Sequence, residues 1–318
     1  MGNDWAIAAT GLRKSYGSGQ ILDGIDLMVP AGTVLAMLGP NGAGKTTMVR
    51  ILSTLIRPDA GQARVAGFDI VRERHLVRRS ISLTGQNVAV DELQTGAENL
   101  RMMARLSGLS AHQAGVRATE LLGLFELTDD GDERVAAYSG GMRRRLDLAA
   151  GLVGRPSVIF LDEPTTGLDL RSRQAMWRII TDLVGTGVSV FLTTQYLEEA
   201  DQVADQIAVV NAGSLVAQGT PAELKNEIAD QRLDLVTTDD VALAAVCTLL
   251  GRRIITCDAE RLSVSVSTDG TAAHVRQLLD EVDPNRTAVR RFNVHIASLD
   301  DVFLALTGEP VEKVAEHV

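Results

Sequence analysis

The stretch 39–46 combines residue types that bind phosphate groups. It reads Gly-Pro-Asn-Gly-Ala-Gly-Lys-Thr and matches the spacing Gly-x-x-x-x-Gly-Lys-Thr. Glycines let backbone N–H groups approach phosphate oxygens closely. A lysine there places a cation on β- and γ-phosphates, and the hydroxyl after it can ligate Mg²⁺. We expect a nucleoside triphosphate to contact Gly39, Pro40, Asn41, Gly42, Ala43, Gly44, Lys45, Thr46 and Thr47, with Lys45 also serving catalysis and Thr46 the metal.

Two adjacent carboxylates, Asp162 and Glu163, follow an apolar segment at residues 158–161. A carboxylate at the end of such a strand can hold Mg²⁺, directly or through water. Glu163 lies one step further, where it can polarise an attacking water as a general base. Neighbouring side chains on a strand point to different faces, so the two residues would not duplicate one role. The alternative is an ordinary acidic transition from strand to loop.

These residues require strands and helices that hold them in place. Uninterrupted apolar runs predict buried strands directly before the glycine-rich loop and before the acidic pair. The expected strands are residues 34–38, 157–161 and 188–193, and the expected helices are 45–56, 143–153 and 171–184, with 92–126 mostly helical. Strands that alternate with helices predict a mostly parallel sheet with helices on its faces.

The pattern changes beyond Pro221. From Arg232 onward it predicts a strand, a helix, two strands, a helix and a strand, which is the βαββαβ order of a ferredoxin-like module. A short helix at residues 301–306 closes it. We therefore expect two domains, 1–224 and 225–318, the second a small α+β module.

The composition limits the classes of function. The 31 basic and 41 acidic residues give a net charge of −10, which argues against a nucleic-acid partner. We find no secretion signal and no apolar run long enough to span a membrane. The two cysteines, Cys247 and Cys257, do not form a disulfide framework, and we expect two small apolar side chains in a reducing cytosol. Arginine greatly outnumbers lysine, which indicates a high-GC bacterial genome.

Two further segments identify a family resemblance. Residues 138–143 (YSGGMR) precede the acidic pair and residues 164–169 (PTTGLD) follow it. Together with the loop at 39–46, they make residues 5–220 resemble the ATP-binding cassette (ABC) ATPases, α/β P-loop domains with a helical subdomain. The resemblance implies ATP and Mg²⁺ as cofactors and a head-to-tail homodimer. In such a dimer, Ser139, Gly140 and Gly141 of one copy face the phosphate-binding loop of the other.

The same resemblance implies roles for four other residues. Tyr16 would stack on adenine, although a surface tyrosine in a turn is the alternative. Gln86 would contact nucleotide and Mg²⁺, and Asp169 would couple the two ATP sites. Gln195 stands where the family has a catalytic histidine. It can donate a hydrogen bond to γ-phosphate, but it cannot become cationic.

The segments 138–145, 193–201 and 298–306 narrow the match to the ATP-binding subunits of daunorubicin/doxorubicin-resistance exporters. This implies a peripheral protein at the cytoplasmic face of the membrane, with a separate multi-span permease that docks on residues 92–126. The consecutive arginines 143–145 either pair with partner acids or ATP phosphates, or form a solvated basic face. The alternatives to an exporter subunit are an importer subunit, a soluble ABC protein, and a weakly hydrolysing regulatory ATPase, which Gln195 keeps open.

Overall fold

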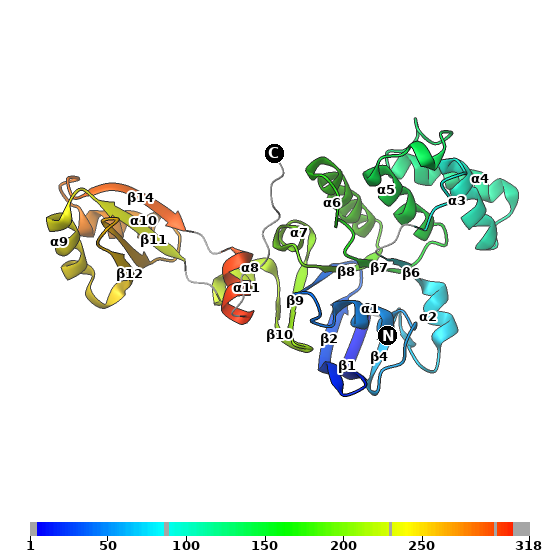
Figure 1. Ribbon diagram of the computed structural model, residues 1–318, viewed down its shortest axis with the longest axis horizontal. Coiled ribbons are helices and arrows are strands. Elements are labelled where there is room, and N and C mark those ends of the chain that lie inside the picture. Colours follow the sequence, from blue (N-terminus) through cyan, green and yellow to red (C-terminus); the bar gives the residue numbers. More distant parts are fainter. Residues whose placement is uncertain (1–4, 86–88, 229–230, 296–297, 308–318) are drawn as a thin grey trace. The chain divides into compact units, whose positions relative to one another are not determined.

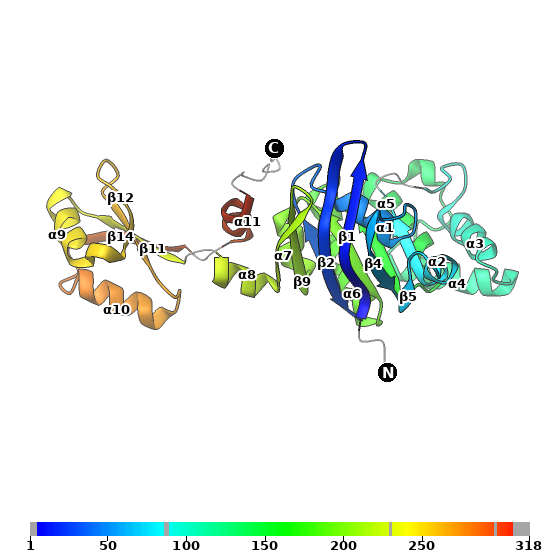
Figure 2. The ribbon, with the colours of Figure 1, turned by 90° about the horizontal axis from the view of Figure 1, so that it is seen from below.

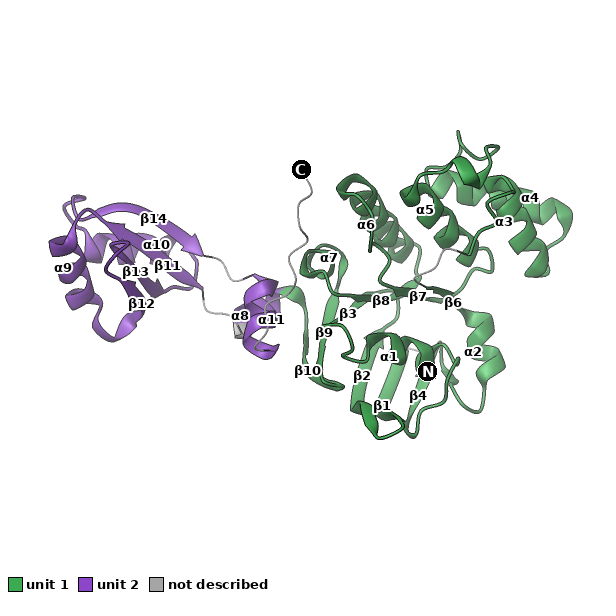
Figure 3. Ribbon diagram, in the orientation of Figure 1, with its two compact units in different colours: residues 1–221 green, residues 222–318 purple. Residues whose placement is uncertain are grey.

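The computed structural model describes residues 5–85, 89–228, 231–295 and 298–307. Figure 3 shows its two compact units, Met1–Pro221 and Ala222–Val318. The boundary expected at 224/225 lies inside helix α8 (Pro221–Ile228). Among the described residues, no helix combines the length and apolar character needed to cross a bilayer.

A six-stranded sheet forms the centre of the first unit. Its strand order is β10-β9-β3-β8-β7-β6, and all neighbours pair in parallel except β10 with β9. The strands are β3 (Val34–Leu38), β6 (Ile81–Thr84), β7 (Val158–Asp162), β8 (Ser189–Thr194), β9 (Gln206–Asn211) and β10 (Ser214–Gly219). Every residue of β3, β7 and β8 is buried, which confirms the buried strands predicted from their apolar runs.

A second, antiparallel sheet has the order β2-β1-β4-β5. It consists of β1 (Trp5–Tyr16), β2 (Gly19–Pro30), β4 (Ala60–Val65) and β5 (Phe68–Asp69). Helix α1 (Lys45–Leu52) packs between the two sheets, as Figures 1 and 2 show, and Met48, Ile51 and Leu52 join one hydrophobic core with both. The glycine-rich loop is therefore anchored at both ends in the same core.

Helices cover the other face of the central sheet, with α6 (Leu170–Gly185) and α7 (Leu197–Val203) against β8 (Figure 1). The expected helical region 92–126 is α3 (Gly96–Leu106) and α4 (Ala111–Leu124), and each begins at a capping box. Both contact α5 (Gly140–Gly151). Helix α5 begins three residues before the predicted start at 143, because the Ser139 side chain accepts the N–H of Met142 and caps it. The remaining elements of the first unit are α2 (Arg74–Ser80) and a 3₁₀ turn at Val135–Ala137.

The second unit has its own hydrophobic core. Its order is β11 (Arg232–Thr237), α9 (Asp240–Leu250), β12 (Ile254–Asp258), β13 (Ser263–Ser267), α10 (Ala272–Val282) and β14 (Val289–His295), with α8 before it and α11 (Leu299–Thr307) after it. The sheet order is β12-β13-β11-β14, and every pair is antiparallel. This is the βαββαβ order expected from the sequence, and we propose the ferredoxin-like classification on that basis.

Candidate nucleotide-binding site

The glycine-rich loop connects β3 to α1 at the carboxyl edge of the central sheet. Gly44 has a φ of 104°, and a Cβ atom there would lie 2.7 Å from Leu22 Cδ2 and 2.8 Å from Ile21 O. A Cβ atom at Gly39 would overlap the carbonyl oxygen of Val210. Close packing thus requires glycine at both positions, and at Gly44 the left-handed backbone conformation requires it as well. The N–H of Ala43 donates to the carbonyl oxygen of Pro40 and closes a turn. Asn41 and Gly42 are exposed at the tip of this turn, and Thr47 lies on the first turn of α1.

Lys45 is almost fully buried, with 5% of its surface exposed. Its Nζ donates to the carbonyl oxygens of Gly39 (2.7 Å) and Pro40 (3.1 Å). It also lies 4.0 Å from Glu163 Oε1. Burial lowers the pKa of Lys45, whereas Glu163 and Asp162 raise it. The loop therefore holds an ammonium group over its own backbone, beside the two predicted carboxylates.

Asp162 ends β7 and is buried. Its Oδ1 accepts hydrogen bonds from Thr193 Oγ1 (2.6 Å) and Thr46 Oγ1 (3.2 Å). Thr193 is the parallel-register partner of Asp162 on β8. The two described residues predicted to hold Mg²⁺ are thus in direct contact. A hydroxyl and one carboxylate are the hard oxygen donors that Mg²⁺ takes in phosphate sites, so the residues fit this ion.

Glu163 has a φ of 51°, in the left-handed region that non-glycine residues rarely adopt. Its N–H donates to the Thr193 carbonyl oxygen (3.1 Å), and its Oε2 accepts from Thr166 Oγ1 (3.4 Å). Such strain persists only where the surroundings enforce it, and it is frequent at functional sites. Here the turn directs the carboxylate toward Lys45 rather than along the strand.

Gln195 and Tyr16 are less closely tied to this centre. Gln195 directly follows β8 and is half-buried, and its side chain has no hydrogen bond within the described ranges. Tyr16 ends β1 with 51% of its surface exposed, and the Lys14 ammonium lies 5.6 Å from its ring centroid. An exposed ring is available for stacking, but the surface-tyrosine alternative also stays open. Gln86 lies outside the described residues.

Ser139 and Asp169 each cap a helix. Ser139 caps α5, and Asp169 caps α6 by accepting from Ser172 N and Ser172 Oγ, both at 2.8 Å. These two hydrogen bonds hold the pKa of the Asp169 carboxyl below its usual range. A Cβ atom at Gly141 would overlap Ser172 Oγ, whereas one at Gly140 would meet nothing within 4 Å. Gly141 therefore lets the starts of α5 and α6 approach each other, and Gly140 leaves an open surface there.

The expectation for arginines 143–145 is wrong, because each has partners inside the chain. Arg143 binds Glu92 (2.9 Å), and Arg145 donates to the carbonyl oxygens of Phe125 (2.9 Å) and Glu126 (3.2 Å). Arg144 is only 6% exposed and donates to backbone carbonyls beside the site. These residues form internal connections rather than a solvated basic face.

The sequence also missed Thr193 and Glu199. Thr193 could have been found from the register of adjacent parallel strands, since it ends β8 where Asp162 ends β7. Glu199 on α7 is fully buried, and Trp177 Nε1 donates to its Oε1 (3.4 Å). Burial raises the pKa of its carboxyl, against the effect of nearby hydrogen-bond donors and Arg173. No sequence signal distinguishes it from the exposed Glu198 beside it.

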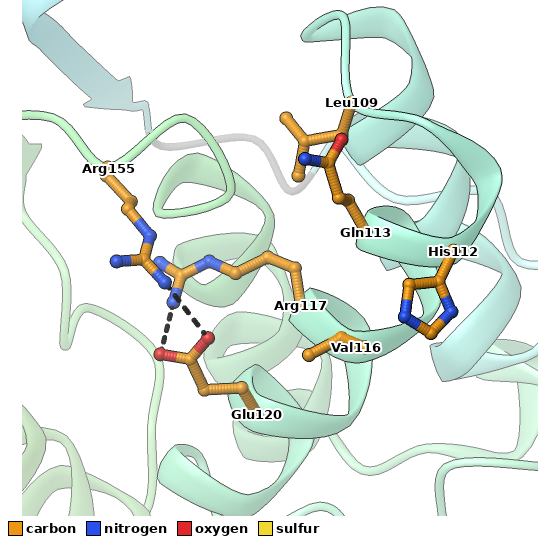
Figure 4. Close-up of a pocket in the computed structure, with 7 residues that line it drawn as sticks. All are labelled: Leu109, His112, Gln113, Val116, Arg117, Glu120 and Arg155. Atoms are coloured by element: carbon orange, nitrogen blue, oxygen red, sulfur yellow. Dashed lines mark hydrogen bonds and ion pairs between the residues drawn. The ribbon is translucent and has the colours of Figure 1, made fainter.

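A separate pocket of about 420 Å³ lies along α4, away from these residues. Figure 4 shows Arg117 and Arg155 converging on Glu120, with ion pairs of 2.7 Å and 3.5 Å. None of its lining residues belongs to the glycine-rich loop or to the acidic pair.

Comparisons with known proteins decide the family. Residues 22–166 match the model described as ABC transporter, and residues 219–307 match that of the ATP-binding protein DrrA1-3-like, C-terminal domain. The daunorubicin resistance ATP-binding protein DrrA3 of Streptomyces coeruleorubidus is 50% identical, with 96% of this chain and 97% of that protein covered. The chain belongs to the ABC transporter family. It is an ATP-binding, ATP-hydrolysing subunit.

Other relatives agree with this assignment. The doxorubicin resistance ATP-binding protein DrrA of Mycobacterium tuberculosis is 46% identical over 99% of this chain and 98% of its own length. The solved structure of cbiO1 from Clostridium perfringens has a TM-score of 0.67 at 24% identity, covering 71% of this chain and 92% of that one. The dimeric ATP-binding cassette MJ0796, bound to ADP and Pi, has a TM-score of 0.60 at 23% identity, covering 67% and 98%. The resemblance to drug-resistance ABC ATPases stated from the motifs is confirmed.

Gly140→Ala and Gly141→Ala should change stability in opposite directions. Alanine at 140 meets no neighbouring atom and removes backbone freedom from the unfolded chain, so the free energy of unfolding should rise by up to about 1 kcal/mol. Alanine at 141 must displace Ser172 and should lower the free energy of unfolding by about 1–3 kcal/mol. Urea unfolding of both variants measures this. Equal effects of the same sign would show that α5 and α6 do not approach as described.

Glu199→Gln should alter how stability depends on pH. A raised carboxyl pKa means that the folded state keeps its proton to higher pH, so stability is lost as pH rises from the ordinary value of 4.5 through the folded pKa. Glutamine removes this loss. The melting temperature of the variant minus that of wild type should increase from pH 5 to pH 8, by about 2–4 °C per kcal/mol. A difference between variant and wild type that stays constant from pH 5 to pH 8 would contradict a raised pKa of the Glu199 carboxyl.

Proposed function

We propose that ATP is hydrolysed with Mg²⁺ at the site formed by residues 39–47, Asp162 and Glu163. One observation carries this proposal: the ammonium of Lys45, the Thr46 hydroxyl and both carboxylates converge at one edge of the sheet. Lys45 would exchange its backbone carbonyl partners for β- and γ-phosphate oxygens. Loop N–H groups and the start of α1 would bind the remaining phosphate charge.

Glu163 is the general base of this site. Its carboxylate would accept the proton of a water that attacks the γ-phosphorus, while its fixed backbone keeps the group in position. Gln195 would donate an N–H to a γ-phosphate oxygen. A bound Mg²⁺ would supply positive charge that stabilises the phosphate groups. Thr46 and Asp162 would hold it, with Gln86 as a further residue assigned from the sequence.

The complete site needs a second copy of the chain. Ser139 and Gly140 lie at the start of α5, whose N-terminal N–H groups form a partial positive charge suited to phosphate. No hydrogen bond or ion pair of the described residues connects them to their own glycine-rich loop. We assign them to the nucleotide of a head-to-tail partner, with Gly141 supporting their position and Asp169 coupling the two sites. Tyr16 would stack on adenine.

The subunit works at the cytoplasmic face of the membrane with a separate permease. Its exposed apolar side chains include Leu93 and Leu106, which are 79% and 76% exposed next to α3 and at its end. They lie in the region that we assign to permease docking. The names of its relatives, which refer to daunorubicin and doxorubicin resistance and to Nod factor export, support export. From the sequence resemblance we assign a drug, an antibiotic or a lipid-like compound as the exported substrate.

A weakly hydrolysing regulatory ATPase is the second candidate, and Gln195 favours it. Glutamine cannot carry the charge of the histidine that the family places there. Hydrolysis would then depend strongly on the partner subunits. The two candidates differ in whether ATP turnover is large enough to drive transport.

Glu163→Gln should abolish hydrolysis and preserve binding. The amide cannot accept the proton of the attacking water, so kcat should fall by about 10²-fold or more. ATP affinity, measured by fluorescence titration, should stay unchanged because the loop is intact. The control Glu120→Gln removes a carboxylate from the α4 pocket and should leave kcat unchanged. Full turnover by Glu163→Gln would show that another group is the base.

Substitutions at position 195 should separate the two candidate functions. Gln195→His supplies an imidazole that can carry charge near γ-phosphate and should raise kcat, whereas Gln195→Ala removes the donor and should lower it. Phosphate release from the purified chain measures both. If neither variant differs from wild type, residue 195 does not contact the transferred phosphate, and the weak-hydrolysis candidate loses its support.

Leu106→Asp should weaken capture of the permease. A charge on an exposed apolar contact should decrease recovery of a multi-span protein when the tagged chain is purified from detergent-solubilised membranes. ATP binding should be unaffected. Leu55→Asp is the matched control, because Leu55 is also exposed (56%) but follows α1. Equal recovery with both variants would exclude Leu106 from the interface, and no recovery with wild type would contradict the transporter proposal.

A further inference from the structure

Arg144 connects α5 to the backbone that carries the catalytic carboxylate. Its Nε donates to the carbonyl oxygen of Pro164 (3.0 Å). One of its terminal nitrogens donates to the carbonyl oxygens of Asp162 (3.4 Å) and Glu163 (3.5 Å). Three consecutive carbonyl groups, centred on Glu163, therefore point at one buried guanidinium group.

Asp147, one turn further along α5, completes this connection. Its Oδ2 lies 3.8 Å from the second terminal nitrogen of Arg144, which also donates to Gly85 O (2.5 Å). Its Oδ1 accepts the N–H of Ala89 (2.9 Å). The Arg144–Asp147 ion pair on α5 thus binds Gly85 and Ala89, which lie on either side of residues 86–88, and also the end of β7.

The arrangement constrains Glu163 from two sides. Its N–H is fixed by Thr193 and its C=O by Arg144, while its φ of 51° is unfavourable for a glutamate. A left-handed residue relaxes unless its surroundings prevent this. The cation that holds the carbonyl groups therefore also determines where the carboxylate points relative to Lys45.

We propose that Arg144 is a positioning residue for hydrolysis, and that Asp147 orients its guanidinium group. The proposal rests on the assigned role of Glu163 as general base. Arg144 lies on α5, the helix that Ser139 and Gly140 begin. It therefore connects two places: the start of α5, which we assign to the nucleotide of a second copy, and Glu163, which we assign to the nucleotide of its own copy.

The test compares Arg144→Met and Arg144→Lys with Arg145→Met in the full chain. Arg145 is the matched control, since it lies on the same helix and donates to two carbonyls away from the site. Arg144→Met should lower kcat by about 10-fold or more while KM and ATP affinity stay near wild type, because misplacing a catalytic group by about 1 Å can cost up to about 10²-fold. Arg144→Lys should restore part of kcat, and Arg145→Met should leave it unchanged.

Several outcomes would overturn the proposal. They are a folded Arg144→Met protein with wild-type kcat, or a loss of kcat that Arg145→Met shares. If Arg144→Met does not fold, Asp147→Asn replaces it: the amide oxygen can still accept from Ala89, but the charge is lost, and kcat should fall with unchanged KM. Failure of the function proposal is recognised separately, by full turnover of Glu163→Gln.

A second, independent observation concerns the cysteines. Cys247 Sγ on α9 and Cys257 Sγ on β12 lie 3.5 Å apart. Cys257 is exposed, and Cys247 is half-buried, with burial and the neighbouring thiol raising its pKa. The sequence indicated two small apolar side chains, but the fold of the second unit brings them together as a dithiol pair.

The geometry points to a site of reversible oxidation by a peroxide. The exposed Cys257 thiolate attacks one oxygen of hydrogen peroxide and becomes a sulfenic acid as hydroxide leaves. Cys247 Sγ then attacks Cys257 Sγ and displaces the hydroxyl group, so two thiols and one peroxide give one disulfide and two waters. Little movement is needed, because the sulfurs are already in contact.

Mass spectrometry of the full chain treated with hydrogen peroxide tests this site. We expect a loss of two hydrogen atoms, a cross-linked peptide pair containing Cys247 and Cys257, and reversal by dithiothreitol. Cys247→Ser should instead accumulate a dimedone-reactive sulfenic acid at Cys257. Two results would overturn the assignment. One is separate oxidation of the two thiols in the wild type. The other is a wild type that stays reduced under the peroxide treatment that gives the sulfenic acid in Cys247→Ser.

Discussion

A buried lysine ammonium is stable only where other groups replace the water that it has lost, and the site depends on this requirement. Carbonyl oxygens of Gly39 and Pro40 solvate Lys45, and the carboxylates of Asp162 and Glu163 favour its charged form. These groups come from the loop after β3 and from the end of β7. The parallel sheet brings both to one edge, so the fold maintains a cation where a triphosphate can replace the backbone carbonyls.

The local parts of this site could be predicted from the sequence, because each depends on contiguous residues. The loop at 39–46 and the pair at 162–163 were found in this way, as were the buried strands that precede them. Thr193 required the register between β7 and β8. Arg144 required the packing of α5 against the end of β7, and Glu199 required the packing of α7 against α6. Polar residues buried by distant parts of the chain look like surface residues in a sequence. The arginines 143–145 were misinterpreted for this reason.

Helix α5 links the two kinds of surface in the proposed composite site. Its first residues, Ser139 and Gly140, are open to a partner, whereas Gly141 packs against α6 and Arg144 binds the backbone around Glu163. A movement at the start of α5 would therefore be transmitted along the helix to Arg144 and, through its hydrogen bonds, to the backbone of the carboxylate that we assign as the general base. In the proposed site, Gln195 lacks the charge of a histidine, and turnover would therefore depend more strongly on such positioning of Glu163. Glutamine in place of histidine at position 195 and the hydrogen bonds of Arg144 thus both bear on how Glu163 is positioned.

The central claim is that each ATP site is shared by two copies of the chain, and mixing two inactive variants tests it most directly. Lys45→Ala destroys the phosphate-binding loop of one copy, and Ser139→Arg blocks the α5 surface of the other. In a head-to-tail dimer of the two, one site keeps an intact loop opposite an intact Ser139. Co-expression should restore roughly a quarter of wild-type hydrolysis, because half of randomly formed dimers are mixed and each has one intact site of two. Hydrolysis that stays at the level of the single variants would contradict a composite site.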